Sequence, residues 1–108
     1  GTTATETRSV DHAYNCTGVG LDPSKSAAPL TRSLVAAGLV RPDPVGLGID
    51  VDEACAVINR NGRASARLYA MGPQTRSRFW EVTAIPDIRI QAAKLAHQLS
   101  AISAKIRR

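Results

Sequence analysis

The pattern that most restricts the fold of this chain lies near its C-terminus. Aliphatic residues recur there at spacings of 4, 3, 4, 3 and 4, at Ile88, Ala92, Leu95, Leu99, Ile102 and Ile106. Such spacings place these side chains on one face of an α-helix. Pro86 and Asp87 suit the first turn of that helix, and the basic residues near its end suit the negative end of the helix dipole. The sequence therefore predicts a long amphipathic C-terminal helix of about five turns.

A second, shorter helix and a connector are expected upstream. In the stretch SAAPLTRSLVAAG, Ser26 suits a helix cap, Pro29 suits the first turn, and Gly38 suits the position just past the end. The stretch VRPDPVGLG that follows contains two prolines and two glycines in nine residues. Because proline and glycine interrupt regular structure, we expect this stretch to be a connector.

Several regions are expected to form short strands. Residues 10–16, VDHAYNC, are compatible with a strand that ends in a glycine-rich turn at residues 17–20. IDVD and CAVINRNGRAS indicate short strands around Asp52-Glu53 and Asn61-Gly62, the latter a strong turn signal. The apolar run at residues 68–71 is typical of a strand buried on both faces, and Gly72-Pro73 ends it. We expect strands 10–16 and 67–71 to lie parallel and adjacent, or nearly so, with the C-terminal helix over one face.

Length and composition limit the chain to one small domain. Residues 1–9 are polar and lack periodicity, so they are expected to be a disordered edge, with the domain at residues 10–108. Apolar residues make up 44% of the chain and aromatic residues 4%, which predicts an aliphatic core. No apolar run approaches the roughly 20 residues of a membrane helix, and no secretion signal is found, so a soluble, cytoplasmic protein is expected. Cys16 and Cys55 lack the spacing of a metal or redox pair and are expected to stay reduced.

The net charge of +5 is unevenly distributed along the chain. Residues 1–59 contain four basic and seven acidic side chains, whereas residues 60–108 contain ten basic and two acidic ones. A basic half of this kind is compatible with nucleic acid, with a phosphate-bearing cofactor or with a solvated face. Tyr69, Phe79 and Trp80 are too few to form the interleaved aromatic series that single-stranded nucleic acid favours.

The stretch GVGLDP at residues 18–23 is close to the G-x-G-x-x-G fingerprint of dinucleotide-binding loops. In that fingerprint the glycines lead directly into a helix whose N-terminus faces the pyrophosphate. Here Pro23 and Ser24 stand where the helix should already be running, and apolar periodicity begins only at Leu30. The strand and turn of a pyrophosphate loop are expected, but its helix is not.

Longer stretches carry a family resemblance. YNCTG resembles the strand and Thr-Gly segment found late in the FAD domain of flavoproteins with two dinucleotide-binding domains, and RLYAMGP resembles the last strand of that domain. RLYAMGPQTRSRFWEVTAIPDIRIQAAKLAHQL is similar to the C-terminal end of the bacterial FAD-NAD(P)-binding protein family. The resemblance extends from Val10 to about Leu99 and implies an α/β fold, as a small, incomplete, Rossmann-like segment of the FAD domain.

The resemblance also implies which residues face the cofactor. They are Thr17 and Gly18 after the first strand, Gly72 and Pro73 after the last strand, and Pro86, Asp87 and Ile88 at the start of the C-terminal helix. Arg76 and Trp80 are weaker candidates for contact with substrate or phosphate. Each has a structural alternative: an ordinary turn at Gly72-Pro73, capping alone at Pro86-Asp87, a solvated loop charge at Arg76, and buried packing at Trp80.

The leading interpretation is therefore the C-terminal part of a FAD-dependent, NAD(P)-linked oxidoreductase that packs against the rest of its own FAD domain. This segment is expected to be catalytically silent alone, because it lacks the pyrophosphate loop and the flavin supplies the redox chemistry. His12 and His97 are isolated, and no metal-binding set is found. Two alternatives stay open: a freestanding interaction or structural module, dimeric through the aliphatic helix, and a basic nucleic-acid-binding domain.

Overall fold

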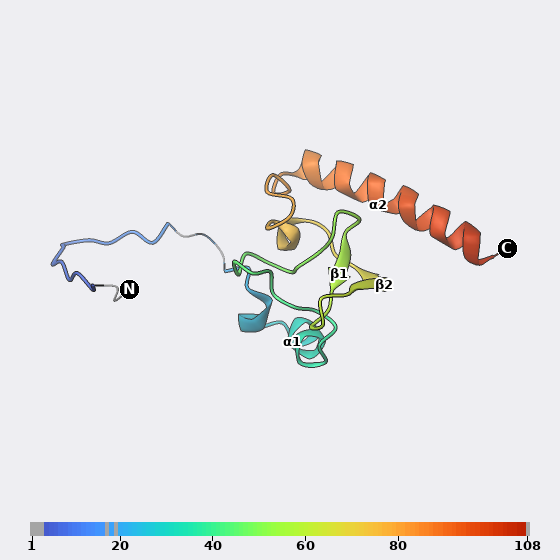
Figure 1. The fold of residues 1–108 in the computed structure, drawn as a ribbon. Helices are drawn as coiled ribbons and strands as arrows, with labels where there is room; N and C mark the ends of the chain where they lie inside the picture. Colours follow the sequence, from blue (N-terminus) through green and yellow to red (C-terminus); the bar gives the residue numbers. More distant parts are fainter. Residues whose placement is uncertain (1–3, 17, 19, 108) are drawn as a thin grey trace.

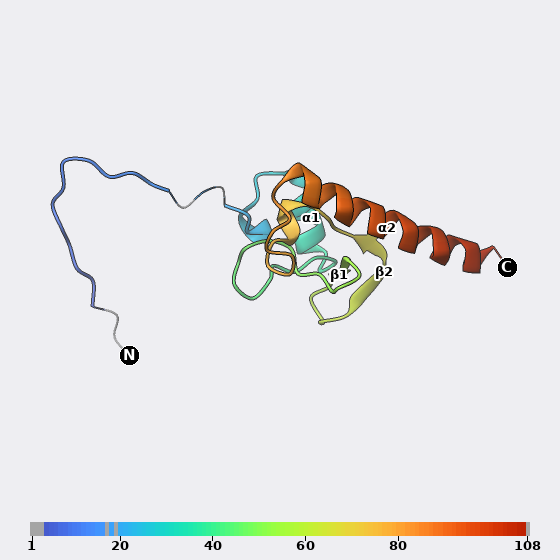
Figure 2. The same ribbon diagram turned by 90° about the horizontal axis from the view of Figure 1, so that it is seen from above.

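The computed structural model describes residues 4–16, 18 and 20–107. The elements follow in the order 3₁₀ helix η1 (Pro23–Lys25), helix α1 (Pro29–Ala36), strands β1 (Ala56–Ile58) and β2 (Ala64–Tyr69), 3₁₀ helix η2 (Pro73–Thr75) and helix α2 (Ile85–Ile106). The short helix α1 and the small sheet lie close together, and α2 runs along one side of them before its C-terminal half projects outward (Figures 1 and 2). The expected mixture of short strands, one short helix and one long helix is confirmed.

Helix α1 begins and ends close to the residues that the sequence indicates. Pro29 occupies its first turn, and Gly38 follows its end with a φ of +73°, a left-handed conformation that glycine adopts readily. Ser26 lies further out than expected: the residue before the helix is Ala28, whose N–H donates to Ser26 Oγ. At the other end, the Arg60 guanidinium donates a 3.0 Å hydrogen bond to Ala36 O, which satisfies one of the free carbonyls of the last turn.

The two strands form an antiparallel hairpin. Ala56 pairs with Tyr69 and Ile58 with Ala64, with an irregularity between the two pairs. The turn is built around Asn59, whose side-chain Oδ1 accepts from the N–H groups of Asn61 and Arg63 at 2.9 and 3.0 Å. Gly62 has a φ of +78°. The turn predicted at Asn61-Gly62 is therefore confirmed.

The core is aliphatic, as the composition predicts. Its buried members come from the connector, from the stretch just after it, from the hairpin and from the residue after β2; they are Val40, Ile49, Val51, Val57 and Ala70. Isolated bridges join Pro42 to Ile49 and Val51 to Val57, so the chain just after the connector runs beside the hairpin. Leu34 and Val35 of α1, together with Leu68 and Phe79, pack against this cluster from the outside.

The prediction of a strand at residues 10–16 is wrong. These residues are exposed, have no regular secondary structure, and run away from the rest of the molecule (Figures 1 and 2). The parallel pairing expected between this segment and residues 67–71 is therefore also wrong. A strand needs a neighbour for its backbone hydrogen bonds, and the only neighbour of β2 in the sheet of the described residues is the antiparallel β1.

Strand β2 also differs from its prediction. Its residues are all exposed or half-buried, whereas the apolar run had indicated burial on both faces. A strand is buried on both faces only when other elements cover both sides of its sheet. A small two-stranded sheet in a chain of this length is not covered in this way. The strand ends at Tyr69, and Ala70, the next residue, is the one that enters the core.

Helix α2 confirms the long C-terminal helix, with Pro86 and Asp87 in its first turn. Its apolar stripe is only partly covered. Leu95 is buried at 9% exposure, but Leu99 and Ile102 are 37% and 36% exposed and Ile106 is 80% exposed. The stripe therefore packs on the body through its N-terminal half and leaves the body with its C-terminal half.

Candidate functional site

The end of β2 and the side of α2 are joined by a buried amide. Gln91, 7% exposed, accepts a 2.7 Å hydrogen bond at Oε1 from the N–H of Gly72. Its Nε2 donates to Thr75 Oγ1 at 3.2 Å and to Cys55 Sγ at 3.5 Å. Thr75 Oγ1 in turn donates to Gly72 O at 2.8 Å. These four residues, Cys55, Gly72, Thr75 and Gln91, form the Gln91 cluster, which fixes the loop after β2 against the second turn of α2.

Gly72 has a conformation that requires glycine. Its φ of +81° and ψ of −162° lie in a region that residues with a side chain avoid. A Cβ built on Gly72 would meet no atom within 4 Å, so open space lies beside its Cα. Its N–H and its carbonyl are both used inside the Gln91 cluster, and Pro73 has no N–H to offer. Gly72 itself is buried, and a ligand cannot take its N–H without displacing Gln91.

The pKa of the Cys55 thiol is raised above its ordinary value. Cys55 is buried just before β1 and has a φ of +62°. The turn that holds it is closed by Asp52, whose Oδ1 accepts from the N–H groups of Ala54 and Ala56, both at 2.9 Å. Burial raises the pKa of the thiol, and the charge of Asp52 raises it further, against the opposing hydrogen bond from Gln91. A thiol of this kind is a poor nucleophile at neutral pH.

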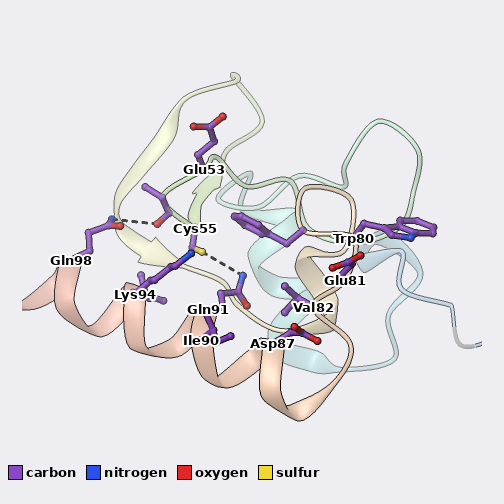
Figure 3. A pocket seen from close by; sticks show the side chains of 13 residues that line it. Glu53, Cys55, Trp80, Glu81, Val82, Asp87, Ile90, Gln91, Lys94 and Gln98 are labelled. Atoms are coloured by element: carbon purple, nitrogen blue, oxygen red, sulfur yellow. Dashed lines mark hydrogen bonds between the residues drawn. The ribbon is translucent and has the colours of Figure 1, made fainter.

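A cavity of about 570 Å³ opens beside the Gln91 cluster. We call it the α2 groove (Figure 3). Its apolar lining consists of Ala54, Cys55, Phe79, Trp80, Val82, Ile90 and Leu95, and its polar lining of Glu53, Glu81, Asp87, Gln91, Lys94 and Gln98. Gln98 Nε2 donates to Ala54 O at 3.3 Å, which ties the far end of the groove to α2. Three carboxylates against one ammonium give the polar lining a net negative charge.

The start of α2 is accessible. Ala84 precedes the helix without capping it through a side-chain hydrogen bond, and Pro86 is exposed, whereas Asp87 and Ile88 are half-buried. The N–H of Ile88 donates to Ala84 O. Asp87 also lines the α2 groove, so the helix start and the groove are continuous.

Arg76 and Trp80 are brought together, but not as buried packing. The Arg76 guanidinium carbon lies 4.6 Å from the centroid of the Trp80 ring, a cation–π arrangement, and Trp80 is 62% exposed. The interpretation of Trp80 as a packed core residue is therefore wrong. In Figure 3 the indole projects outward from its loop. Arg76 Nε is buried without a hydrogen-bond partner, so the guanidinium is held by the ring and not by an acceptor at that nitrogen.

The N-terminal candidates are not joined to this region by any described contact. Thr17 lies outside the described residues. Gly18 is exposed with a φ of +77°, and a Cβ built on it would meet no atom within 4 Å. The structure thus brings Gly72, Pro73, Pro86, Asp87 and Ile88 into one region and leaves Gly18 in the extended N-terminal segment.

Sequence reasoning missed Gln91, Thr75 and Cys55. Cys55 had been considered only for its spacing to Cys16, and Gln91 and Thr75 looked like ordinary polar residues of a helix and a loop. The one available signal was the position of Gln91 beside the apolar stripe of α2, where a polar side chain meets the body and needs a partner there. Which partner it finds is not encoded locally.

In the part of the chain that the structure describes, no three His, Cys, Asp or Glu side chains gather in a way that could hold a metal ion. None of the described helices combines the length and apolarity needed to cross a bilayer. Comparison with protein-family models, with curated proteins and with solved structures gives no match.

Proposed function

We propose that this chain is the C-terminal part of a FAD-dependent, NAD(P)-linked oxidoreductase and supplies the flavin-facing end of a strand and start of a helix. The observation that carries the proposal is the 2.7 Å hydrogen bond between Gly72 N–H and Gln91 Oε1. It holds the end of β2 beside the first turns of α2, although a loop separates the two elements in sequence. A flavin site of the kind that the sequence resemblance implies needs these two elements at one place.

The room beside Gly72, where a side chain would otherwise lie, supports this function. A flavin is a flat ring system. Because glycine has no Cβ, its backbone allows the ring to approach more closely than the backbone of any other residue does. Since the Gly72 N–H is occupied by Gln91, the contribution of Gly72 is shape, and the hydrogen-bond donors come from elsewhere.

The uncapped start of α2 supplies such donors. The first N–H groups of a helix lack partners within the helix and carry partial positive charge, which favours an electron-rich group. Pro86 has no N–H, so the N–H groups of Ile85 and Asp87 are the ones on offer in the first turn. When bound, FAD supplies the redox chemistry, and these residues position the ring and polarise its edge.

Two further features support a place in a larger domain. Strand β2 has β1 on one edge and no other sheet neighbour among the described residues, so its second edge is available for pairing with another strand. The Arg76 guanidinium lies over Trp80, which lines the groove, and would pair there with a phosphate or a substrate carboxylate. Thr17 and Gly18 stay in this proposal as a second wall that the remaining part of the domain would bring into place.

FAD titration followed by flavin fluorescence tests the proposal. The 108-residue chain is expected to show no saturable binding at micromolar FAD, because the pyrophosphate loop is missing, whereas the longer protein that the proposal implies binds FAD tightly. In that longer protein, Gly72→Ala is expected to abolish binding. Gly46→Ala is the matched control, because Gly46 also has a positive φ, +72°, and open space at its Cβ position, but lies in the connector.

Three results would reject the flavin proposal. One is tight FAD binding by the 108-residue chain alone, another is no binding by the longer protein, and the third is equal loss of binding in the two glycine variants. The exposed aliphatic residues at the end of α2 favour a second candidate, an interaction module that associates through this helix.

A further inference from the structure

The C-terminal end of α2 is an apolar surface with basic charges beside it. We call residues 99–107 the C-terminal arm. Leu99, Ile102 and Ile106 follow one another on a single face of the helix and are 37%, 36% and 80% exposed. Lys105 and Arg107 flank them. The arm projects beyond the body in both views of the fold (Figures 1 and 2).

The α2 groove has the complementary properties. Its floor is apolar and contains Phe79, Val82 and Leu95, and Ile90 on its helix side is 56% exposed. Its carboxylates, Glu53, Glu81 and Asp87, outnumber its one ammonium, that of Lys94. Glu53 lies on the hairpin side of the groove, whereas Glu81 and Asp87 lie near the start of α2 (Figure 3). An apolar segment with basic flanks fits this lining in both hydrophobicity and charge.

We propose that two copies of this chain form a two-fold dimer in which the C-terminal arm of each copy packs antiparallel along α2 and into the α2 groove of the other. Each copy has one arm and one groove, so both contacts form at once and the assembly closes at two. The dimer does not depend on flavin binding and goes beyond the proposed function.

The sequence of the apolar stripe suits an antiparallel pair. Spacings of 4, 3, 4, 3 and 4 read the same from either end, with their centre at position 97. Two α2 helices that cross there in opposite directions bring Leu99, Ile102 and Ile106 of one arm level with Leu95, Ala92 and Ile88 of the other copy. Of these three, Leu95 lines the α2 groove, and Ala92 and Ile88 are half-buried. The same crossing brings Arg107 of one copy opposite Asp87 of the other. It also brings Lys105 level with Arg89, so the charge match rests on Arg107 with Asp87, and the apolar match rests on the arm and the groove lining.

The exposed surface is large enough for such an interface. The chain exposes 8632 Å², whereas a compact monomer of its mass exposes about 5,800 Å². A stable interface of ordinary size removes about 800 Å² from each partner. The extended N-terminal segment accounts for part of the surplus, and the projecting arm, with its uncovered aliphatic face, contributes a further part.

Sedimentation velocity over a range of concentrations tests the dimer in the 108-residue chain. The unmodified chain is expected to be a dimer at high micromolar concentration. Ile102→Glu is expected to weaken dimerisation about tenfold or more, because it introduces a charge at the centre of the apolar contact. Leu30→Glu, which makes a similar exchange at a 71% exposed residue of α1, is the control and leaves the dimer intact. Circular dichroism checks that both variants keep their helices.

A charge exchange tests the orientation of the two helices. Arg107→Glu and Asp87→Arg each weaken the dimer by roughly two- to fivefold. Combined in one chain, the two changes restore it, because each copy then presents the reversed pair. A strict monomer, open-ended association, a dimer that Ile102→Glu leaves unchanged, or a double variant no tighter than the single ones would each overturn the proposal. None of these results bears on the flavin proposal, which the FAD titration tests separately.

Discussion

At the scale of single residues, Gln91 is the side chain that joins α2 to the loop after β2. Its amide makes three hydrogen bonds to parts of the chain that are distant in sequence, namely Gly72, Thr75 and Cys55. A buried amide that finds all its partners specifies one arrangement of the elements around it, because any other arrangement leaves buried polar groups unpaired. The same residue therefore holds α2 on the body and shapes the loop that begins at Gly72.

Gln91→Leu is expected to lower the free energy of unfolding by about 1–3 kcal/mol, because the buried Gly72 N–H loses its acceptor. Urea denaturation followed by circular dichroism measures the change. Gln98→Leu is the control: Gln98 is half-buried and makes one 3.3 Å hydrogen bond to Ala54 O, so its loss costs less. Equal costs for the two substitutions would show that the Gln91 cluster does not hold the helix.

The two cysteines are expected to differ in reactivity. Cys16 is exposed and Cys55 is buried. Burial raises the pKa of the Cys55 thiol above its ordinary value, so the reactive thiolate is scarce at neutral pH. Iodoacetamide at neutral pH should therefore alkylate Cys16 first and Cys55 only in denaturant, as intact-mass spectrometry would show. Because the unfolded chain releases the Cys55 proton at lower pH than the folded chain, this group makes folding less stable as the pH rises above the ordinary thiol pKa.

At the scale of elements, local signals and packing contribute differently. The hairpin turn is local: one asparagine side chain, Asn59, bonds two backbone N–H groups, and Gly62 supplies the positive φ. Helix α2 combines a local period with incomplete packing, since its first half lies on the body and its arm does not. The hairpin turn and helix α2 are both clearly predicted by the sequence, but they differ in how much tertiary contact stabilises them.

Asn59→Ala is expected to destabilise the hairpin by about 0.5–1.5 kcal/mol, because the N–H groups of Asn61 and Arg63 lose their side-chain acceptor. Thermal unfolding measures the effect. Asn61→Ala keeps the backbone N–H that bonds Asn59 and is the matched control. If both substitutions destabilise equally, the turn is not organised by the Asn59 side chain.

At the scale of the whole molecule, the chain is extended for its length. Its radius of gyration is 17.7 Å and its dimensions are 67 × 32 × 29 Å, whereas a compact domain of this size has a radius of about 13 Å. The N-terminal segment and the C-terminal arm both lie outside the aliphatic core (Figure 2). A core with so few fully buried side chains offers limited stabilisation, so contacts outside the chain should matter for its stability.

The melting temperature is therefore expected to rise with protein concentration, because association stabilises the folded state by mass action. Calorimetry at a low and a high protein concentration measures this rise. In Ile102→Glu the melting temperature should rise less over the same range of concentration. A concentration-independent melting temperature in the unmodified chain would contradict the dimer.

What the sequence determined by itself lies in short stretches of chain. The limits of α1 and α2, the connector after Gly38 and the turn at Asn61-Gly62 follow from helical spacing, proline and glycine, since each signal acts within a few residues. The aliphatic nature of the core follows from composition.

Only the tertiary structure decided how distant stretches meet. Residues 10–16 have strand-forming residues but no neighbouring strand, and the apolar run at 68–71 joins an antiparallel pair with one open edge. Trp80 is exposed, because its ring contacts the Arg76 guanidinium and does not pack into the core. The bond from Gly72 to Gln91 depends on how the loop between β2 and α2 folds back. All buried polar and apolar groups compete for partners, and this competition selects such contacts. No local sequence pattern encodes its outcome.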